Sequence, residues 1–165
     1  MTGEGKQPNK QRYGGVGVSY ANGPFYAAIA AETIRQAADV AAEDPQIYSL
    51  AANYDFGVAK VFGGYQYAKD SAWGGEKLNA GTLGVSAPVA GGKLYASAGD
   101  KDAEQTVNSD NKQKAFNLGL GYTYNFSKRT MFYTAAGYQE VKDEDSSGSS
   151  KTKTTTVITG LVHKF

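Results

Sequence analysis

Hydrophobic and polar residues alternate with a period of two along almost the whole chain from Tyr13 onward. The clearest example is residues 116–126, where Phe, Leu, Leu, Tyr, Tyr and Phe alternate with Asn, Gly, Gly, Thr and Asn. Residues 46–56 show the same split less completely. Successive side chains of a β-strand point to opposite faces, so this pattern predicts strands with one apolar face and one polar face.

Turn signals divide the alternating pattern into about nine strands. The predicted strands are residues 12–20, 24–33, 46–56, 59–69, 78–89, 93–101, 114–126, 129–142 and 152–165. Tight turns are predicted at 21–23, 57–58, 90–92 and 127–128, three of them with glycine available for a positive φ. Long polar loops are predicted at 34–45, 70–77, 102–113 and 143–151. Tight turns and long loops alternate, so they should lie at opposite rims.

One segment fits the strand pattern poorly. Residues 27–45 are rich in Ala, Glu and Gln and could form an amphipathic helix that ends at Pro45. We interpret this segment as a strand to about Thr33, with one helical turn in the loop that follows.

Composition excludes several classes of function. The chain has 165 residues, with no cysteine and one histidine, His163. Disulfides, thiolate metal sites, two-histidine metal sites and a Ser–His–Asp triad within the chain are therefore excluded. We expect no catalytic residues, no metal and no cofactor. The 17 Lys and Arg nearly balance the 16 Asp and Glu, so a nucleic-acid partner is not expected either.

The aromatic residues indicate what the apolar faces contact. A soluble barrel turns its apolar face inward, whereas an outer-membrane barrel turns it toward lipid and gathers aromatics at both ends of its strands. Tyr and Phe lie near both predicted rims here, and Gly, Ala, Leu and Val fill the middle of the strands. Strands of about ten residues can also cross a bilayer when tilted. Residues 1–11 are polar and lack the apolar region of a signal peptide.

Three segments carry a family resemblance: YGGVGVSYANGPFYAAIAAE at 13–32, YTYNFSKRTMFYTAAGYQEVKD at 122–143, and GLVHKF at the end. They resemble the C-terminal half of a Gram-negative general porin of the beta-proteobacterial type. The resemblance implies an antiparallel transmembrane β-barrel in the outer membrane, trimeric and sixteen-stranded, with residues 12–165 forming its last strands. It also implies lipid and lipopolysaccharide contact and a water-filled channel for passive diffusion of ions and small hydrophilic solutes.

Nine strands do not close a bacterial barrel of even strand number. The expected explanation is that the chain is part of a porin, and a nine-stranded barrel that stands alone is the alternative.

Residues opposite the apolar stripes are the pore-lining candidates. They are Tyr26, Glu32, Asn53, Asp55, Lys60, Gln66, Ser86, Lys93, Asn117, Thr123 and Lys164. The lysines among them could bias permeation toward anions. The last strand places Val157, Leu161, His163 and Phe165 on one face, and by resemblance its aromatic end is the signal for the barrel-assembly machinery. Val157 and Leu161 are also candidate trimer contacts.

Two other functions remain open at this stage. One is a structural or adhesive surface barrel without an open pore, and the other is a soluble ligand-binding β-barrel. An enzyme is not expected, because a single histidine cannot supply the usual catalytic pairs.

Overall fold

The computed structural model describes residues 12–35, 44–71, 75–104, 111–145 and 147–165. All regular structure in these ranges is β-strand, and they contain no helix long and apolar enough to cross a membrane. The strands are β1 (Arg12–Asn22), β2 (Phe25–Arg35), β3 (Gln46–Asp55), β4 (Lys60–Ser71), β5 (Gly75–Val89), β6 (Gly92–Glu104), β7 (Lys112–Asn125), β8 (Thr130–Asp145) and β9 (Gly148–His163).

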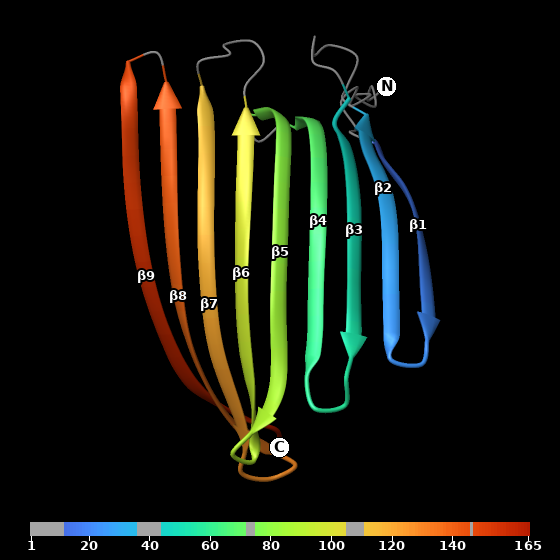
Figure 1. Cartoon of the computed structure of the whole chain (residues 1–165), viewed down its shortest axis with the longest axis vertical. Helices are drawn as coiled ribbons and strands as arrows, with labels where there is room; N and C mark the ends of the chain where they lie inside the picture. The colour runs from blue at the N-terminus through green and yellow to red at the C-terminus, as the bar shows by residue number, and fades with distance from the viewer. Residues whose placement is uncertain (1–11, 36–43, 72–74, 105–110, 146) are drawn as a thin grey trace, which may run out of the picture.

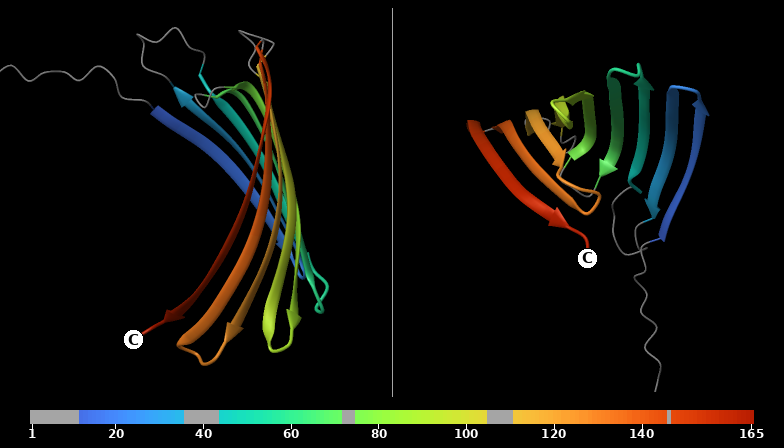
Figure 2. Two further views of the ribbon diagram at one scale, coloured as in Figure 1. Left: turned by 90° about the vertical axis from the view of Figure 1, so that its left-hand side faces the viewer. Right: turned by 90° about the horizontal axis from the view of Figure 1, so that it is seen from below.

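The nine strands form one sheet in which each strand pairs antiparallel with the next along the chain (Figure 1). The predicted all-β antiparallel fold is confirmed. Within the described residues, β1 and β9 each pair with a single neighbour, so the sheet is open. The sheet curves strongly into a trough, and the two further views show its convex and concave sides (Figure 2).

The tight turns lie together at one rim, as the sequence predicts (Figure 1). Gly23, Gly57 and Gly91 have φ of 55°, 82° and 77°, and each supplies the left-handed backbone that a short hairpin connection needs. Ala90 also takes a positive φ of 48°, next to Gly91.

At the opposite rim, two of the predicted long loops are largely strand. β4 continues to Ser71 and β5 begins at Gly75, so the predicted loop 70–77 is wrong. β8 continues to Asp145 and β9 begins at Gly148, so the predicted loop 143–151 is wrong as well. Charged and hydroxyl side chains marked these stretches as loops, but backbone pairing does not require an apolar face.

The other two long connections are confirmed in outline. β2 ends at Arg35 and β3 begins at Gln46, and β6 ends at Glu104 before β7 begins at Lys112. β2, which the sequence predicted to end at about Thr33, therefore runs two residues further, to Arg35. The helical turn expected after it falls at 36–43, outside the described residues.

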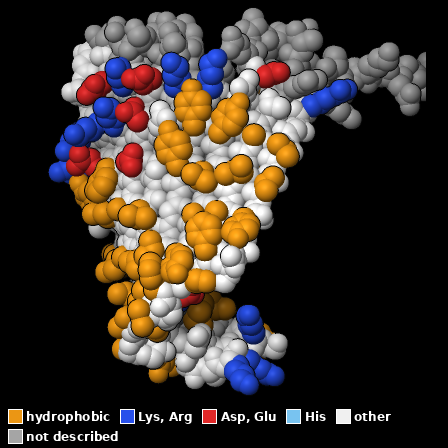
Figure 3. Space-filling model, turned by 45° about the vertical axis from the view of Figure 1, so that its right-hand side comes forward, with side chains coloured by type: hydrophobic (Ala, Val, Ile, Leu, Met, Phe, Trp, Pro, Cys, Tyr) orange, Lys and Arg blue, Asp and Glu red, His pale blue; other side chains and the backbone are white. Residues whose placement is uncertain are grey.

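Strand register aligns the apolar stripes into one continuous surface. Val18, Ile29, Leu50 and Tyr65 are directly opposite one another on four neighbouring strands, and their side chains are 65%, 58%, 50% and 49% exposed. This face is convex, and hydrophobic side chains cover its middle while charged ones gather at the loop end (Figure 3). We call it the outer face, and we call the concave face the inner face.

The buried strand residues lie on the inner face instead. Ala68 and Ser86 are 3% and 4% exposed, because side chains on a concave surface crowd one another. An apolar side chain such as Leu50 therefore has no core to enter, and the sheet has the polarity of a membrane barrel wall rather than of a soluble sandwich.

Candidate pore wall

The inner face gathers the residues that the sequence predicts to line a pore. Asp55, Lys60, Ser86 and Tyr95 follow one another across β3 to β6, each directly opposite the next. The same alternation and register place ten of the eleven candidates on this face, namely Tyr26, Glu32, Asn53, Asp55, Lys60, Gln66, Ser86, Lys93, Asn117 and Thr123.

The eleventh candidate, Lys164, lies one residue beyond the end of β9. Its backbone N–H donates to the carbonyl oxygen of Arg129 at 2.9 Å, so the chain still follows β8 there. The strand ladder itself does not include Lys164.

A charged cluster lies on the inner face at the tight-turn rim. Lys60 Nζ lies 3.5 Å from Asp55 Oδ2, and Gly57 N–H donates to the other carboxylate oxygen at 2.9 Å. Lys93 Nζ lies 5.2 Å from the ring centre of Tyr95. The Asp55 carboxylate thus contacts both the turn and Lys60. With Lys93 as the second lysine, the net charge of the cluster is positive.

Small residues leave the middle of the inner face hollow. Gly119, Gly121, Ala135 and Gly137 on β7 and β8 line an open recess of about 370 Å³, together with Phe62, Tyr95 and Ile158 of neighbouring strands. A packed barrel interior would place bulky side chains at these four positions. Glycine and alanine there leave open space, which suits a lumen that holds water.

Sequence reasoning missed several inner-face residues. Phe62 and Tyr95 are aromatic although they face the polar side, and Phe62 covers Gly84 on the neighbouring strand. Their positions in the sequence could have shown this, because Phe62 and Tyr95 alternate with the residues of the apolar stripes on β4 and β6 and must therefore face the other side.

The sequence also did not predict a series of side-chain hydrogen bonds on the inner face at the loop rim. Lys101 donates to Gln113 Oε1 at 3.1 Å, and Gln113 donates to Asp143 Oδ1 at 2.8 Å. Two of its three members fall in segments that the sequence assigned to loops, so their face could not be predicted. The inner wall therefore carries polar and charged side chains at both rims.

Aromatic residues border the outer face at both ends. At the tight-turn rim, the rings of Tyr54 and Phe56 are 4.6 Å apart and those of Tyr124 and Phe126 are 5.3 Å apart. Toward the loops, the rings of Tyr48 and Tyr67 stack at 6.4 Å. Two such girdles around an apolar band are typical of a transmembrane barrel.

The predicted assembly residues lie at the sheet edge. Val157, Leu161 and His163 share the outer face of β9, where Val157 and Leu161 are 70% and 67% exposed. His163 Nδ1 lies 2.9 Å from Thr130 Oγ1, and its ring meets that of Phe165 edge-on at 5.0 Å. Phe165 lies beyond the strand and is fully exposed. Nowhere in the described ranges do three potential metal ligands gather.

A sequence profile described as "Gram-negative porin" matches residues 2–144. The chain belongs to this porin family. It is therefore an outer-membrane protein of Gram-negative type, and the resemblance noted in the sequence is confirmed.

Individual porins support the assignment. Outer membrane porin protein 32 of Delftia acidovorans is 36% identical over 142 residues, which is 83% of this chain and 38% of that protein. An outer membrane porin of Bordetella pertussis is 26% identical over 90% of this chain and 45% of its own length. The chain thus spans less than half the length of these relatives.

Solved porin structures share the fold. The anion-selective porin from Comamonas acidovorans matches with a TM-score of 0.71 and 33% identity, over 93% of this chain and 49% of its own. OmpT of Vibrio cholerae matches with a TM-score of 0.73 at 16% identity, which supports the fold alone. In each case this porin sheet corresponds to only part of a longer chain.

Proposed function

We propose that this porin sheet is part of the wall of a water-filled channel through which ions and small hydrophilic solutes diffuse passively across the outer membrane. The observation that carries the proposal is the opposite polarity of the two faces. Leu50 and Leu120 are half exposed on the outer face, whereas Asp55, Lys60 and Asn117 face the hollow inner side. A lipid-facing apolar band and a polar interior are what a conducting barrel requires.

Closure of that channel requires further strands. In the part of the chain that the structure describes, nine antiparallel strands leave β1 and β9 running in the same direction, each with one edge unpaired. Unpaired edges are not tolerated in the hydrocarbon region, because their N–H and C=O groups find no water there. We therefore infer that residues 12–165 contribute nine strands to a larger porin barrel.

We also propose a weak preference for anions. The Comamonas structure at 33% identity is described as anion-selective. In this chain, Lys60 and Lys93 place positive charge on the inner wall at the tight-turn rim, and Asp55 offsets only part of it. A charged rim raises the local concentration of the opposite ion.

Reversing those two charges tests the preference. Lys60→Glu combined with Lys93→Glu should lower the anion-to-cation permeability ratio by roughly a factor of two to ten, because the field at the rim changes sign. The measurement is the zero-current potential of single channels in a planar bilayer under a salt gradient. Lys112→Glu with Lys153→Glu, the same change in charge on the outer face, serves as control. An equal shift of the zero-current potential in both variants would show that Lys60 and Lys93 do not set the anion preference.

The alternative functions fare differently. A soluble ligand-binding barrel does not fit the exposed outer face or membership of the porin family. A structural or adhesive barrel without a pore would insert into membranes and give no discrete conductance steps, so the same bilayer recording distinguishes it.

Membership of the porin family suggests two partners, further copies of the chain and the barrel-assembly machinery. We propose a homotrimer, with the exposed outer face of Val157 and Leu161 as a contact. We also propose that the barrel-assembly machinery recognises the last strand through its aromatic end at Phe165, which lies beyond β9 and is fully exposed.

A further inference from the structure

The open recess of about 370 Å³ on the inner face, which we call the inner recess, has an aromatic side. Phe62 and Tyr95 supply two rings from β4 and β6, with β5 between them. Phe62 reaches across β5, because its ring lies over Gly84, where an added Cβ would overlap it. Tyr95 is 36% exposed on this wall. The two rings therefore form an accessible side of the recess and do not fill a core.

Small residues complete the inner recess. From Tyr95 it continues across Gly121 and Ala135 to Ile158, each directly opposite the next on β7, β8 and β9. No side chain larger than a methyl group lies between the Tyr95 ring and Ile158 in this register. Recesses of this volume with mainly apolar linings are typical of small-ligand sites. A flat apolar ring placed there would displace water from apolar surface, which is favourable.

Positive charge borders the inner recess on the side of the tight turns. Lys60 lies two residues before Phe62 on β4. Lys93 lies two residues before Tyr95 on β6, and its Nζ lies 5.2 Å from the centre of that ring. Asp55 attracts both lysines, but it is one carboxylate against two ammonium groups. An anionic group attached to an apolar ring would therefore find net positive charge beside the recess.

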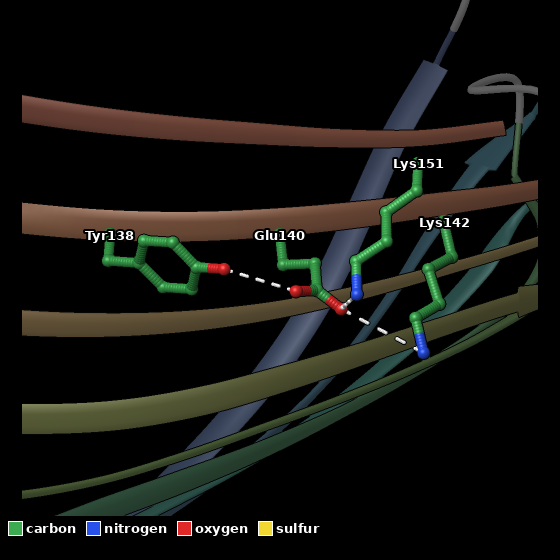
Figure 4. A network of polar contacts seen from close by, with 4 residues as sticks. All are labelled: Tyr138, Glu140, Lys142 and Lys151. Atoms are coloured by element: carbon green, nitrogen blue, oxygen red, sulfur yellow. Dashed lines mark hydrogen bonds and ion pairs between the residues drawn. The ribbon is translucent and has the colours of Figure 1, made fainter.

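The charged residues of the outer face lie out of reach of the same solute. Glu140 accepts a hydrogen bond from Tyr138 at 3.1 Å and pairs with Lys142 and Lys151 at 3.8 Å and 2.7 Å (Figure 4). These four side chains lie on the outer face of β8 and β9, so the sheet separates them from the inner recess. A solute in the lumen meets the two lysines at the tight-turn rim and not this outer-face pair.

We propose that the inner recess is a subsite for small aromatic carboxylates, which bind there briefly as they cross the channel. The ring of the solute packs against Phe62 and Tyr95, and its carboxylate points toward Lys60 and Lys93. Aromatic rings attract one another beyond the gain from burial, and lysine binds an anion as a point charge. This inference rests on the proposed channel, and it adds a solute class that an anion preference alone does not single out.

Block of the channel current tests the subsite in the complete porin. In planar bilayers, benzoate should reduce the single-channel current at about tenfold lower concentration than acetate, which carries the same charge without a ring. The variant F62A/Y95A should raise the half-blocking concentration of benzoate about three- to tenfold and leave that of acetate unchanged. Y13A removes a ring from the inner face of β1, near the loop rim and away from the recess, and should behave like the unmodified protein.

Further variants test the subsite even if F62A/Y95A does not fold. G121L fills the inner recess and keeps both rings, and a Cβ fits there because the nearest atoms would lie 3.7 Å away. It should weaken block by benzoate about as much as loss of the rings does. K60Q/K93Q should weaken block by both anions, because it removes the net positive charge. K142Q/K151Q, the same loss of charge on the outer face, should weaken neither.

The outcomes separate this subsite from the channel itself. Channels that conduct but are blocked equally by benzoate and acetate would overturn the subsite and leave the proposed channel intact. Absence of conductance steps in the unmodified protein would overturn both. Unchanged block by benzoate in G121L would overturn the subsite, and block by neutral benzyl alcohol as strong as that by benzoate would overturn the role of the lysines.

Discussion

Replacing Leu120 with arginine is expected to destabilise the folded barrel by about 2–4 kcal/mol, the cost of a cation on the lipid face near the bilayer midplane. Leu120 lies in the middle of β7, on the outer face, and is 54% exposed. Its neighbours across the sheet, Ala96 and Ala136, offer no carboxylate to pair with the new charge. Urea titration of the protein refolded in lipid vesicles, followed by tryptophan fluorescence or heat-modified gel mobility, measures the change.

The matched control is Asn117→Arg, three residues away on the same strand but on the inner face. We expect it to change stability by less than about 1 kcal/mol, because a lumen-facing guanidinium stays hydrated. If both arginines cost the same, the two faces do not differ in their surroundings, and the assignment of the outer face to lipid fails.

Gly92→Ala is expected to lower the free energy of unfolding by about 1–3 kcal/mol, the usual range for overpacking a close contact. Gly92 opens β6 directly after the turn. A Cβ added there would overlap the backbone carbonyl oxygen of Thr123 and the ring of Tyr122. Tyr122 cannot move away freely, since its hydroxyl donates to the carbonyl oxygens of Val89 and Ala90 at 3.1 Å each.

Gly137→Ala provides the comparison for Gly92. The nearest atom to a Cβ at Gly137 is the carbonyl oxygen of Leu118 at 3.9 Å, which is an ordinary contact. This variant should be as stable as the unmodified protein, or slightly more so, because alanine restricts the unfolded chain. Equal urea midpoints for the two variants would show that the close approach at Gly92 does not constrain the hairpin.

The sequence predicted the faces well where one side of a strand is wholly apolar. Residues 116–126 split almost completely, and the structure places Leu118 and Leu120 outside with Asn117 inside. β8 could not be assigned in this way because aromatics occupy both of its faces. Only the register with β7 and β9 shows that Phe132 faces outward and Tyr133 inward.

The loop rim was the least predictable part. The strands there extend beyond the apolar band, and a polar residue such as Lys151 or Asp143 carries the same sequence signal in a strand as in a loop. Strand pairing continues there because the backbone hydrogen bonds between strands form with polar and apolar side chains alike. Lys114, Lys142 and Lys151 lie directly opposite one another on β7, β8 and β9 although they are 9 to 37 residues apart in sequence, and only the register brings them together.

Cysteine scanning of β7 tests the central claim, that one face of the sheet meets lipid and the other meets water. The chain has no cysteine, so each substitution gives a single site. In the membrane-embedded porin, a charged membrane-impermeant thiol reagent should modify cysteines at Asn117 and Thr123 and reduce conductance. Cysteines at Leu118, Leu120 and Tyr122 should stay unmodified. Equal labelling along the strand, or labelling of the second group alone, would contradict the account.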